Sequence, residues 1–501
     1  MKKFTVAFCA LILLTLFNNN VAKAAPADTI SLAQAQDIAA YYHAIAMGQS
    51  SYKADHAVLV QRVVNPVQGA PIAYYFNIAN GGWVIVSGTT VTHPIIAFCE
   101  DGELDPSNYA PSMKNWMDGF CGMLIDAQDQ QIEMTDELAK EWYEVLNHGL
   151  CPVAQSKATN WLIDTKWGQG ESYNPTFNIY SPVLWGSYCP VGCVSTALSQ
   201  IMKYYEYPVV GSGMKAYREK YTRDDDPNHV YQKSPVTIHF DTVYDYANMP
   251  NQLYANSDSV QIKATALLCF YVGVSVNMDY DVDGSGALSQ DVPGAMYGRF
   301  KYKRGNLVYR SQYSSENWMD TLRGSLQAKR PLYYAASSST GSGGDAAGHA
   351  FLCHGNYPTQ PNLFRINWGW YGSSDGWFDM STVEGLVVRS YGYNFSIRQE
   401  AIFGLEPPDD SNRFVGIQMV EMNADVLPAY PNPAFNTVTI PYTLQGVALS
   451  SLQIFDITGK LVEEVRVNSG SNKITINVSN YPQGIYIYRL KGGTSKKFIV
   501  Q

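Results

Sequence analysis

One stretch near the middle of the chain combines a turn with a strongly patterned helix. Within residues 185–208, WGSYCPVGCVSTALSQIMKYYEYP, apolar side chains from Val194 to Tyr205 recur three and four positions apart. This spacing is that of one buried helix face, and Pro208 is expected to close the segment. The pattern therefore predicts a turn that delivers Cys193 onto the first turn of a helix.

The patterns elsewhere divide the chain into three regions. Residues 25–150 alternate helical and strand signals, such as ISLAQAQDIAAYYHAIA, APIAYYFNIA and GGWVIVSGTT, and include a charged helix from Thr135 to Leu146. From Ala158 to about Pro407, aromatic and Gly-rich loops separate short apolar runs. The tail shows short alternating strands with regular turn signals, which predict a β-sandwich of about 75 residues. The predicted fold class is α+β, with an Ig-like β-sandwich at the C-terminus.

Length and composition narrow the classes of protein. The 501 residues suggest about two to four domains, and 46% hydrophobic with 16% charged residues suits packed globular domains. The formal net charge of −9 gives no basic footprint for nucleic acid, so no nucleic-acid partner is expected.

The N-terminus has the features of a secretory signal peptide. Lys2 and Lys3 precede an apolar core from Phe4 to Phe17, and Ala22-Lys23-Ala24 fits a small-x-small cleavage site. No later run is long and apolar enough for a transmembrane segment. We therefore expect a signal peptide over residues 1–24 and an exported protein.

The cysteine count favours a free thiol. Cys9 leaves with the signal, and an odd number remains, so at least one thiol is outside any intramolecular disulfide. A thiol at a helix start is favoured as a thiolate nucleophile, and its backbone N–H is placed for an oxyanion. Cys193 has that position; Cys189 is the rival, and a disulfide role for Cys193 is the structural alternative. The seven remaining cysteines are Cys99, Cys121, Cys151, Cys189, Cys193, Cys269 and Cys353.

Candidate partners for this thiol lie on both sides of it. Gln169, in a Gly-flanked loop, offers a side-chain N–H donor for an oxyanion, although an ordinary loop role is the simpler interpretation. His349 begins an apolar strand after a small-residue loop, and His354 should point the other way along that strand. In the next strand, Asn367 or Trp368 is available to orient and shield an imidazole.

Metal sites fit the sequence poorly. Residues 279–290, DYDVDGSGALSQ, approach a calcium loop, but Gln290 stands where a bidentate Glu is needed. We also expect no convincing helix on both sides, and prefer a flexible loop that faces substrate. His349 and His354 lack a third ligand at zinc spacing. No metal or cofactor is predicted.

Three motifs in order, GCVSTALSQIMKYYEYP, GHAFLCHG and RINWGWYGSSDGWF, resemble the streptopain (C10) family of cysteine peptidases, bacterial relatives of papain. The resemblance covers roughly residues 25–400, because GGWVIVSG also resembles the family's propeptide. It implies Cys193 as nucleophile, His349 as general base and acid, Gln169 as oxyanion-hole donor and Trp368 as the tryptophan beside the histidine, with Asn367 as a papain-like third member. The extra cysteines Cys189 and Cys353 depart from streptopain and leave a disulfide or redox control open.

The tail resembles the sorting domain of the type IX secretion system of Bacteroidetes. The resemblance rests on YPNPA, the DxxGK of Asp456 to Lys460, GIYIYRL and the terminal KKFIV. It implies the type IX machinery as a partner, passage through the periplasm and across the outer membrane, and release or attachment at the cell surface.

Together these features predict a secreted cysteine endopeptidase, made as a zymogen, that acts on protein or peptide substrates. Two alternatives stay open: an inactive surface adhesin, and an acyltransferase on the same fold. The expected organisation is a signal peptide (1–24), an inhibitory propeptide (25–155), a papain-like peptidase domain (156–407), a linker (408–427) and a sorting domain (428–501).

Overall fold

The computed structural model divides the chain into two compact units, residues 1–408 and 409–501, which are described separately. The predicted signal peptide, the junction at 150–160 and most of the predicted linker lie outside the described residues. The described residues are 29–149, 161–170, 176–217, 220–223, 226–232, 236–337, 348–383, 386, 398–408, 424–444, 449–457, 460–468, 472–490 and 495–501.

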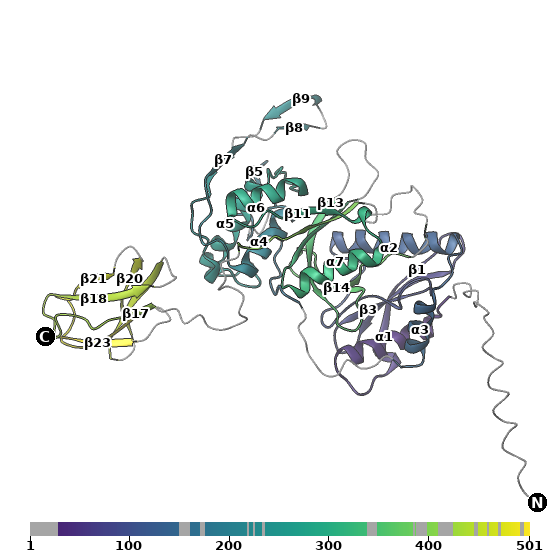
Figure 1. The fold of residues 1–501 in the computed structure, drawn as a ribbon, viewed down its shortest axis with the longest axis horizontal. Coiled ribbons are helices and arrows are strands. Elements are labelled where there is room, and N and C mark those ends of the chain that lie inside the picture. Colours follow the sequence, from purple (N-terminus) through teal and green to yellow (C-terminus); the bar gives the residue numbers. More distant parts are fainter. Residues whose placement is uncertain are drawn as a thin grey trace, which may run out of the picture. The chain divides into compact units, whose positions relative to one another are not determined.

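The first unit is built on one ten-stranded antiparallel sheet, to which both halves of the unit contribute (Figure 1). In spatial order the strands are β1 (Ala57–Val64), β2 (Pro71–Ile78), β3 (Trp83–Ser87), β4 (Ile95–Cys99), β15 (Gly376–Asp379), β14 (Leu363–Asn367), β13 (Gly348–Asn356), β12 (Leu332–Ser337), β16 (Arg398–Phe403) and β11 (Asn306–Tyr309). The two halves meet where β15 pairs with β4, with Trp377 opposite Phe98 and Phe378 opposite Ala97. Strands of the N-terminal region, residues 29–149, thus share one sheet with strands of residues 306–403, which lie in the predicted peptidase half.

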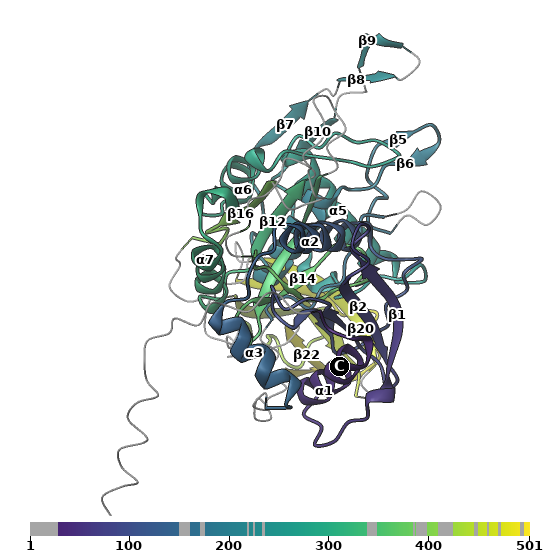
Figure 2. The same cartoon turned by 90° about the vertical axis from the view of Figure 1, so that its right-hand side faces the viewer.

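Helices cover both faces of this sheet. On one face, α1 (Leu32–Ala46) lies over β1 to β3, and α1 and α3 (Asp136–Leu146) share a buried cluster with them (Figure 2). On the opposite face, α2 (Pro111–Asp129) and α7 (Ser315–Gln327) contribute to another cluster, which spans both halves of the sheet. Ser31 caps α1 through a capping box with Gln34, and this satisfies N–H groups at the helix start.

The predicted central helix is confirmed as α4 (Cys193–Tyr205). It packs with α5 (Ser259–Ser275) and α6 (Val292–Phe300) against the face of β12 and β13 that carries Tyr333 and Ala350. The nucleophile candidate therefore starts a helix that lies directly on the strand of His349. Smaller elements are β5 (Val183–Leu184), β6 (Ser187–Tyr188), β7 (Met214–Tyr217), β8 (Lys220–Arg223), β9 (Asp226–Gln232), β10 (Val236–His239) and the 3₁₀ turns η1 (Ala54–His56), η2 (Tyr246–Asn248), η3 (Ser289–Asp291) and η4 (Arg310–Gln312).

A buried ion pair links the N-terminal region to the peptidase half. Arg365 on β14 donates to Glu100, just after β4, over 2.7 Å, and the indole N–H of Trp377 donates to the same carboxylate over 2.6 Å. The guanidinium lies over the rings of Trp161 and Trp377 at 4.8 and 5.6 Å from their centroids. Such a pair is costly to break on one side, because the remaining charge stays buried.

A second electrostatic contact involves His93, between β3 and β4. Its Nδ1 lies 2.6 Å from Glu141 of α3. Burial acts to lower the pKa of His93, but the carboxylates of Asp379 on β15 and Glu141 outweigh it and raise the pKa to about 9. The His93 imidazolium thus interacts with two carboxylates, that of buried Asp379 on β15 and that of Glu141 on α3.

This contact predicts a loss of precursor stability at alkaline pH. Because the folded-state pKa of His93 lies above its unfolded value, the stabilisation is fully present below pH 6.5 and is lost as the pH rises through about 9. In a Cys193→Ala precursor, the melting temperature should fall more steeply between pH 7 and 10 than in the same chain with His93→Gln. Parallel pH curves would contradict the prediction.

The second unit is the predicted β-sandwich. One sheet contains β17 (Ala424–Val426), β18 (Thr437–Leu444) and β21 (Lys473–Asn477), and the other contains β20 (Leu461–Asn468), β19 (Leu449–Phe455), β22 (Gly484–Leu490) and β23 (Ser495–Val500). Residues from both sheets, including Ile440 and Tyr488, form one buried cluster. The alternation of buried and exposed positions along β22 and β23 is that expected of strands with one face in the core.

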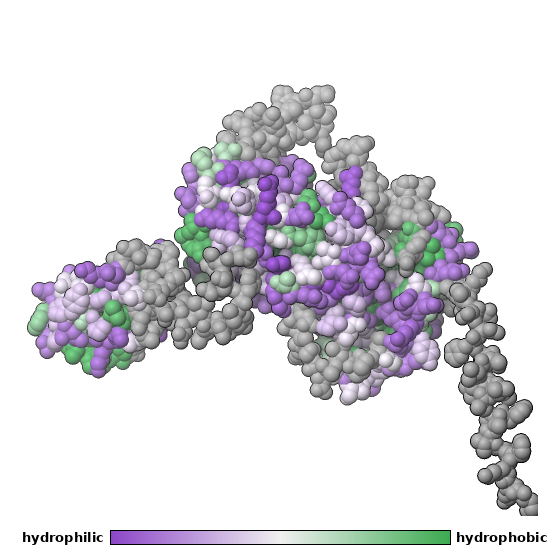
Figure 3. All heavy atoms as spheres, in the orientation of Figure 1, coloured by the Kyte–Doolittle hydropathy of each residue, from purple (hydrophilic) through white to green (hydrophobic). Residues whose placement is uncertain are grey.

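The face of the molecule drawn in Figure 3 is mainly hydrophilic. In the view of Figure 3, polar residues dominate the described surface and apolar patches are limited in extent. Among the described helices, none combines the length and the hydropathy needed to cross a membrane.

Candidate active site

The turn before Cys193 is shaped by a glycine. Gly192 has φ +83°, and a Cβ at this position would lie 2.6 Å from Met278 Sδ and 2.7 Å from the carbonyl oxygen of Ser285. A larger residue would therefore be strained and would also clash. The predicted delivery of Cys193 onto the first turn of a helix is confirmed, since α4 begins at this residue.

The segment 279–290, whose sequence approaches that of a calcium loop, supports this turn. Residues 279–290 bring Asp279 and Gly286 into a short antiparallel bridge, and Ser285 lies against Gly192. The expectation of no helix on both sides is wrong, because α5 and α6 flank the segment. Within the described part of the chain, no group of three or more His, Cys, Asp or Glu side chains has an arrangement that could hold a metal ion.

Cys193 and His349 are brought together. Burial acts to raise the pKa of the Cys193 thiol, but the charge of His349, a hydrogen bond with its ring and the N–H groups of Ala350 and Val194 outweigh it, and the pKa is lowered. Burial raises the pKa of Cys99 and of Cys269 to about 12. The lowered pKa favours the thiolate at Cys193, whereas the raised pKa values of Cys99 and Cys269 favour the uncharged thiol at neutral pH.

The His349 ring is held by a backbone group and two aromatic rings. Its Nε2 lies 2.7 Å from the carbonyl oxygen of Trp368, and because a carbonyl only accepts, this nitrogen carries the hydrogen. Nδ1 is then the nitrogen available to the thiol. The rings of Phe351 and Trp370 stack with the imidazole at centroid distances of 6.3 and 6.1 Å.

Trp368 contributes differently from the prediction. Its backbone carbonyl contacts His349, while its fully buried side chain packs on Phe351 and donates its indole N–H to the carbonyl of Ser374 over 3.0 Å. The ring stacked on the imidazole is that of Trp370. Trp370 was not singled out in the sequence, although the WGW motif contains it.

Asn367 contacts the imidazole only through a peptide group. Its side-chain oxygen accepts from the N–H of Gly369 over 2.9 Å, and that N–H belongs to the peptide whose carbonyl meets His349. Its side-chain nitrogen donates to the Thr165 carbonyl over 2.7 Å and to Gln200 over 3.1 Å. In this structure the Asn367 side chain therefore reaches the imidazole through the Trp368–Gly369 peptide group, and its role as a papain-like third member stays a prediction.

Gln200 is a buried polar residue that the sequence analysis missed. It lies on α4, seven positions after Cys193, and its Oε1 accepts from Thr165 Oγ1 over 2.9 Å and from Asn367 over 3.1 Å. It links the helix of the thiol to the strand that leads to Trp368. The available signal was its spacing, because a residue seven positions after Cys193 lies on the same face of the helix as the thiol.

The Gln169 loop is fastened next to the thiol. The N–H of Val191, in the turn before α4, donates to the Gln169 carbonyl over 2.8 Å, and the N–H of Gly170 donates to the Tyr371 hydroxyl over 3.1 Å. Gln169 itself is 9% exposed. The loop thus connects the nucleophile turn to the Trp368 segment.

The remaining candidates have structural roles. Nδ1 of buried His354 accepts from the N–H of Ile163 over 3.3 Å, and burial, with Arg365, lowers the pKa of His354 to about 3. His354 is therefore neutral and separate from the contacts of His349. Cys189 and Cys353 are fully buried thiols, and Cys151 lies outside the described residues.

The N-terminal region reaches the elements that support His349. Trp116 of α2 contacts the rings of Trp368 and Phe351 at centroid distances of 6.2 and 6.0 Å. The N–H of Ala110 meets Ser374 Oγ at 3.3 Å. The aromatic cluster beneath the imidazole is therefore completed by the N-terminal region.

Three family models match successive parts of the chain. Residues 27–120 match the Spi protease inhibitor, residues 167–378 the Peptidase C10 family and residues 428–501 the Secretion system C-terminal sorting domain. The sorting domain indicates secretion or export to the cell surface.

Known proteins are similar in sequence over part of this chain, and a solved structure shares its fold. The thiol protease/hemagglutinin PrtT of Porphyromonas gingivalis is 28% identical over 67% of this chain, but the match spans only 37% of PrtT. Streptopain of Streptococcus pyogenes is 28% identical over 67% of this chain and 80% of its own length. A fragment of Prevotella intermedia prointerpain A shares the fold with a TM-score of 0.54 and 23% identity, over 70% of this chain and 98% of the fragment. The chain therefore contains a Peptidase C10 region over residues 167–378, preceded by a Spi protease inhibitor region and followed by a secretion system C-terminal sorting domain.

Proposed function

We propose that this chain is the secreted zymogen of a cysteine endopeptidase that hydrolyses peptide bonds in proteins through a thioester on Cys193. The observation that carries the proposal is the lowered pKa of a thiol at the start of α4 beside His349. The contact of His349 Nε2 with the Trp368 carbonyl supports it, because it leaves Nδ1 facing the thiol. This is the arrangement of an activated nucleophile with its base.

The proposed reaction has two halves. His349 takes the thiol proton, and the Cys193 thiolate attacks the peptide carbonyl. The backbone N–H of Cys193 and the Gln169 side chain donate to the oxyanion. The imidazolium then protonates the leaving amine and the thioester forms. In the second half, His349 takes a proton from water, the resulting hydroxide attacks the thioester, and the thiol is regenerated as the acid product leaves.

The proposed zymogen state rests on the contacts of the N-terminal region. Trp116 packs into the aromatic cluster under the imidazole, and Glu100 pairs with buried Arg365. Removal of the region would change both environments. We therefore propose residues 25–155 as the inhibitory propeptide, residues 156–407 as the peptidase domain, residues 408–427 as the linker and residues 428–501 as the sorting domain that directs export through the periplasm.

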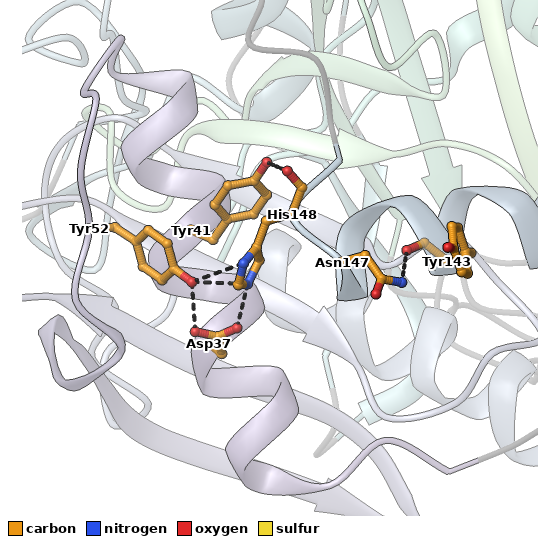
Figure 4. Close-up of polar contacts among 6 residues, drawn as sticks. All are labelled: Asp37, Tyr41, Tyr52, Tyr143, Asn147 and His148. Carbon is orange, nitrogen blue, oxygen red and sulfur yellow. Dashed lines mark hydrogen bonds and ion pairs between the residues drawn. The ribbon is translucent and has the colours of Figure 1, made fainter.

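The flanks of the proposed cleavage junction are anchored to different elements. On the N-terminal side, Asp37 and Tyr52 contact the His148 ring at 2.7 and 2.9 Å, and Tyr41 donates to the His148 carbonyl over 2.6 Å (Figure 4). On the other side, the N–H of Leu162 donates to the carbonyl of His354 on β13 over 2.8 Å. Cutting between these anchors would leave each flank attached to its own half.

The function is tested by labelling and hydrolysis. Matured enzyme treated with an active-site-directed epoxide should lose hydrolysis of a peptide substrate, with the label at Cys193 by peptide mapping. His349→Ala should be inactive and should label more slowly with iodoacetamide near pH 6, because the imidazolium holds the thiol pKa down. Unlabelled, inactive wild type would favour an adhesin, and preferred transfer to added amines would favour an acyltransferase.

Gln169→Ala tests the oxyanion role separately. Removal of one oxyanion donor should lower kcat by roughly 10²- to 10³-fold, while KM changes little. Steady-state kinetics on a single peptide substrate measure both constants. An effect on KM alone would instead assign Gln169 to substrate binding.

A further inference from the structure

Asp375 fixes Trp368, the residue whose backbone carbonyl contacts His349. Its Oδ1 accepts from the backbone N–H of Trp368 over 2.8 Å, and Asp375 is 9% exposed. The neighbouring carbonyl of Ser374 accepts from the Trp368 indole over 3.0 Å. The N–H and the indole of Trp368 are both fixed from the 374–375 segment, and its carbonyl lies 2.7 Å from His349 Nε2.

We propose that Asp375 is a positioning residue for the Cys193–His349 pair, acting by fixing the Trp368 backbone so that its carbonyl stays on His349 Nε2. The inference rests on the proposed function only in taking this pair as the reacting groups. A charged acceptor makes a stronger hydrogen bond than a neutral one, so the ionised carboxylate restrains Trp368 more firmly than the protonated acid does.

The surroundings of Asp375 give its carboxyl group a pKa at which it changes charge within the ordinary pH range. Burial raises the pKa of Asp375 to about 6, against the opposing effects of the Trp368 N–H, Arg365 on β14 and Lys166 before α4. Asp101 of the N-terminal region, on the loop after β4, raises it further. Acidification through pH 6 therefore neutralises the carboxylate, and the hold on the Trp368 carbonyl weakens.

This mechanism makes the difference between wild type and Asp375→Asn depend on pH. The variant is nearly isosteric but lacks the charge at every pH. Above pH 7 the wild type should react faster, by roughly tenfold, the low end of the effect of removing the outer partner of a metal-bound histidine. Near pH 5 the two should converge, because the wild-type carboxyl is then protonated. A merely structural role would change both ends of the pH range by the same factor.

The experiment measures iodoacetamide alkylation of Cys193 in the full-length chain from pH 5 to 8, with the Cys193 peptide quantified by mass spectrometry. Asp258→Asn is the matched control, since the Asp258 side chain also accepts from a backbone N–H, but from that of Val260 at the start of α5 rather than from Trp368. It should follow the wild-type curve. A constant ratio between wild type and Asp375→Asn, or equal pH dependence of the two Asn variants, would overturn the proposal.

Two further measurements keep the test decisive. Should Asp375→Asn fail to fold, Asp101→Asn, at an exposed position, should move the acid limb of wild-type alkylation to lower pH, and an unmoved limb would overturn the proposal. Peptide hydrolysis by the matured enzyme separates the two hypotheses. If the alkylation ratio depends on pH but no variant hydrolyses the peptide, the positioning role is supported and the peptidase function is contradicted. If the peptide is hydrolysed but the ratio is constant, the peptidase function is supported and the positioning role is contradicted.

Discussion

Replacing Cys193 with alanine is expected to lower peptide hydrolysis on the order of 10⁶-fold, the effect of removing a catalytic nucleophile. The fold should persist, because α4 begins at this position without a side-chain cap and alanine is the best helix former. The precursor should also accumulate uncut if maturation is autocatalytic. Kinetics on a peptide substrate and electrophoresis of the purified chain measure both effects.

The matched control is Cys189→Ala. Cys189 is four residues earlier and fully buried, so its loss removes a small volume from the core without touching the reacting pair. Substantial activity should survive. If Cys189→Ala is inactive and Cys193→Ala is active, the nucleophile assignment is wrong, and if Cys193→Ala matures at the normal rate, another protease performs the cleavage.

Glu100→Ala is expected to release the N-terminal region from the peptidase half. It removes the partner of Arg365, whose side chain is 10% exposed, and the acceptor of the Trp377 indole. Breaking one side of a fully buried ion pair costs about 3–5 kcal/mol, and the 26% exposure of the Glu100 side chain places this pair at the lower end. A loss of about 3 kcal/mol weakens docking by more than about 100-fold. The uncut Glu100→Ala precursor should therefore hydrolyse peptides much faster than the uncut wild type.

Initial rates on freshly purified precursor, before any cleavage, measure this effect. Urea unfolding in a Cys193→Ala background measures the stability change without self-cleavage. Asp118→Ala provides the control, because Asp118 pairs with Lys114 at the exposed surface of α2 and such pairs contribute about 0.5 kcal/mol or less. Equal initial hydrolysis rates of the uncut Glu100→Ala and Asp118→Ala precursors would show that the Glu100–Arg365 pair does not hold the precursor closed.

Local features of the site were predictable because side-chain periodicity encodes them. The apolar spacing after Cys193 specified the helix start, and the apolar run after His349 specified β13. The contact between His349 and Trp368 was not predictable in detail, since the acceptor is a backbone carbonyl and every residue has one. Asn367 was a candidate because a side-chain amide can orient an imidazole, yet in the structure its amide is used by the buried network with Gln200.

The pairing of strands that lie far apart in the sequence also could not be predicted from the pattern of apolar residues. β3 and β4 are buried at every position, so periodicity identifies them as strands but does not say which strand lies beside them. The partner of β4 is β15, more than 270 residues later. Near the 279–290 loop, α5 carries almost no polar face and the nine-residue α6 contains a proline and two glycines, which explains why neither was recognised as a helix.

If the N-terminal region is removed as proposed, the shared sheet has a consequence for the matured enzyme. Strand β15 then becomes an edge strand, with unpaired N–H and C=O groups along Gly376 to Asp379 and the apolar Trp377 and Phe378 beside them. Such an edge is a template for pairing with another chain. In the proposed zymogen, the N-terminal region would keep this edge covered until it is removed, and the short length of β15, together with its terminal Asp379, would limit self-association afterwards.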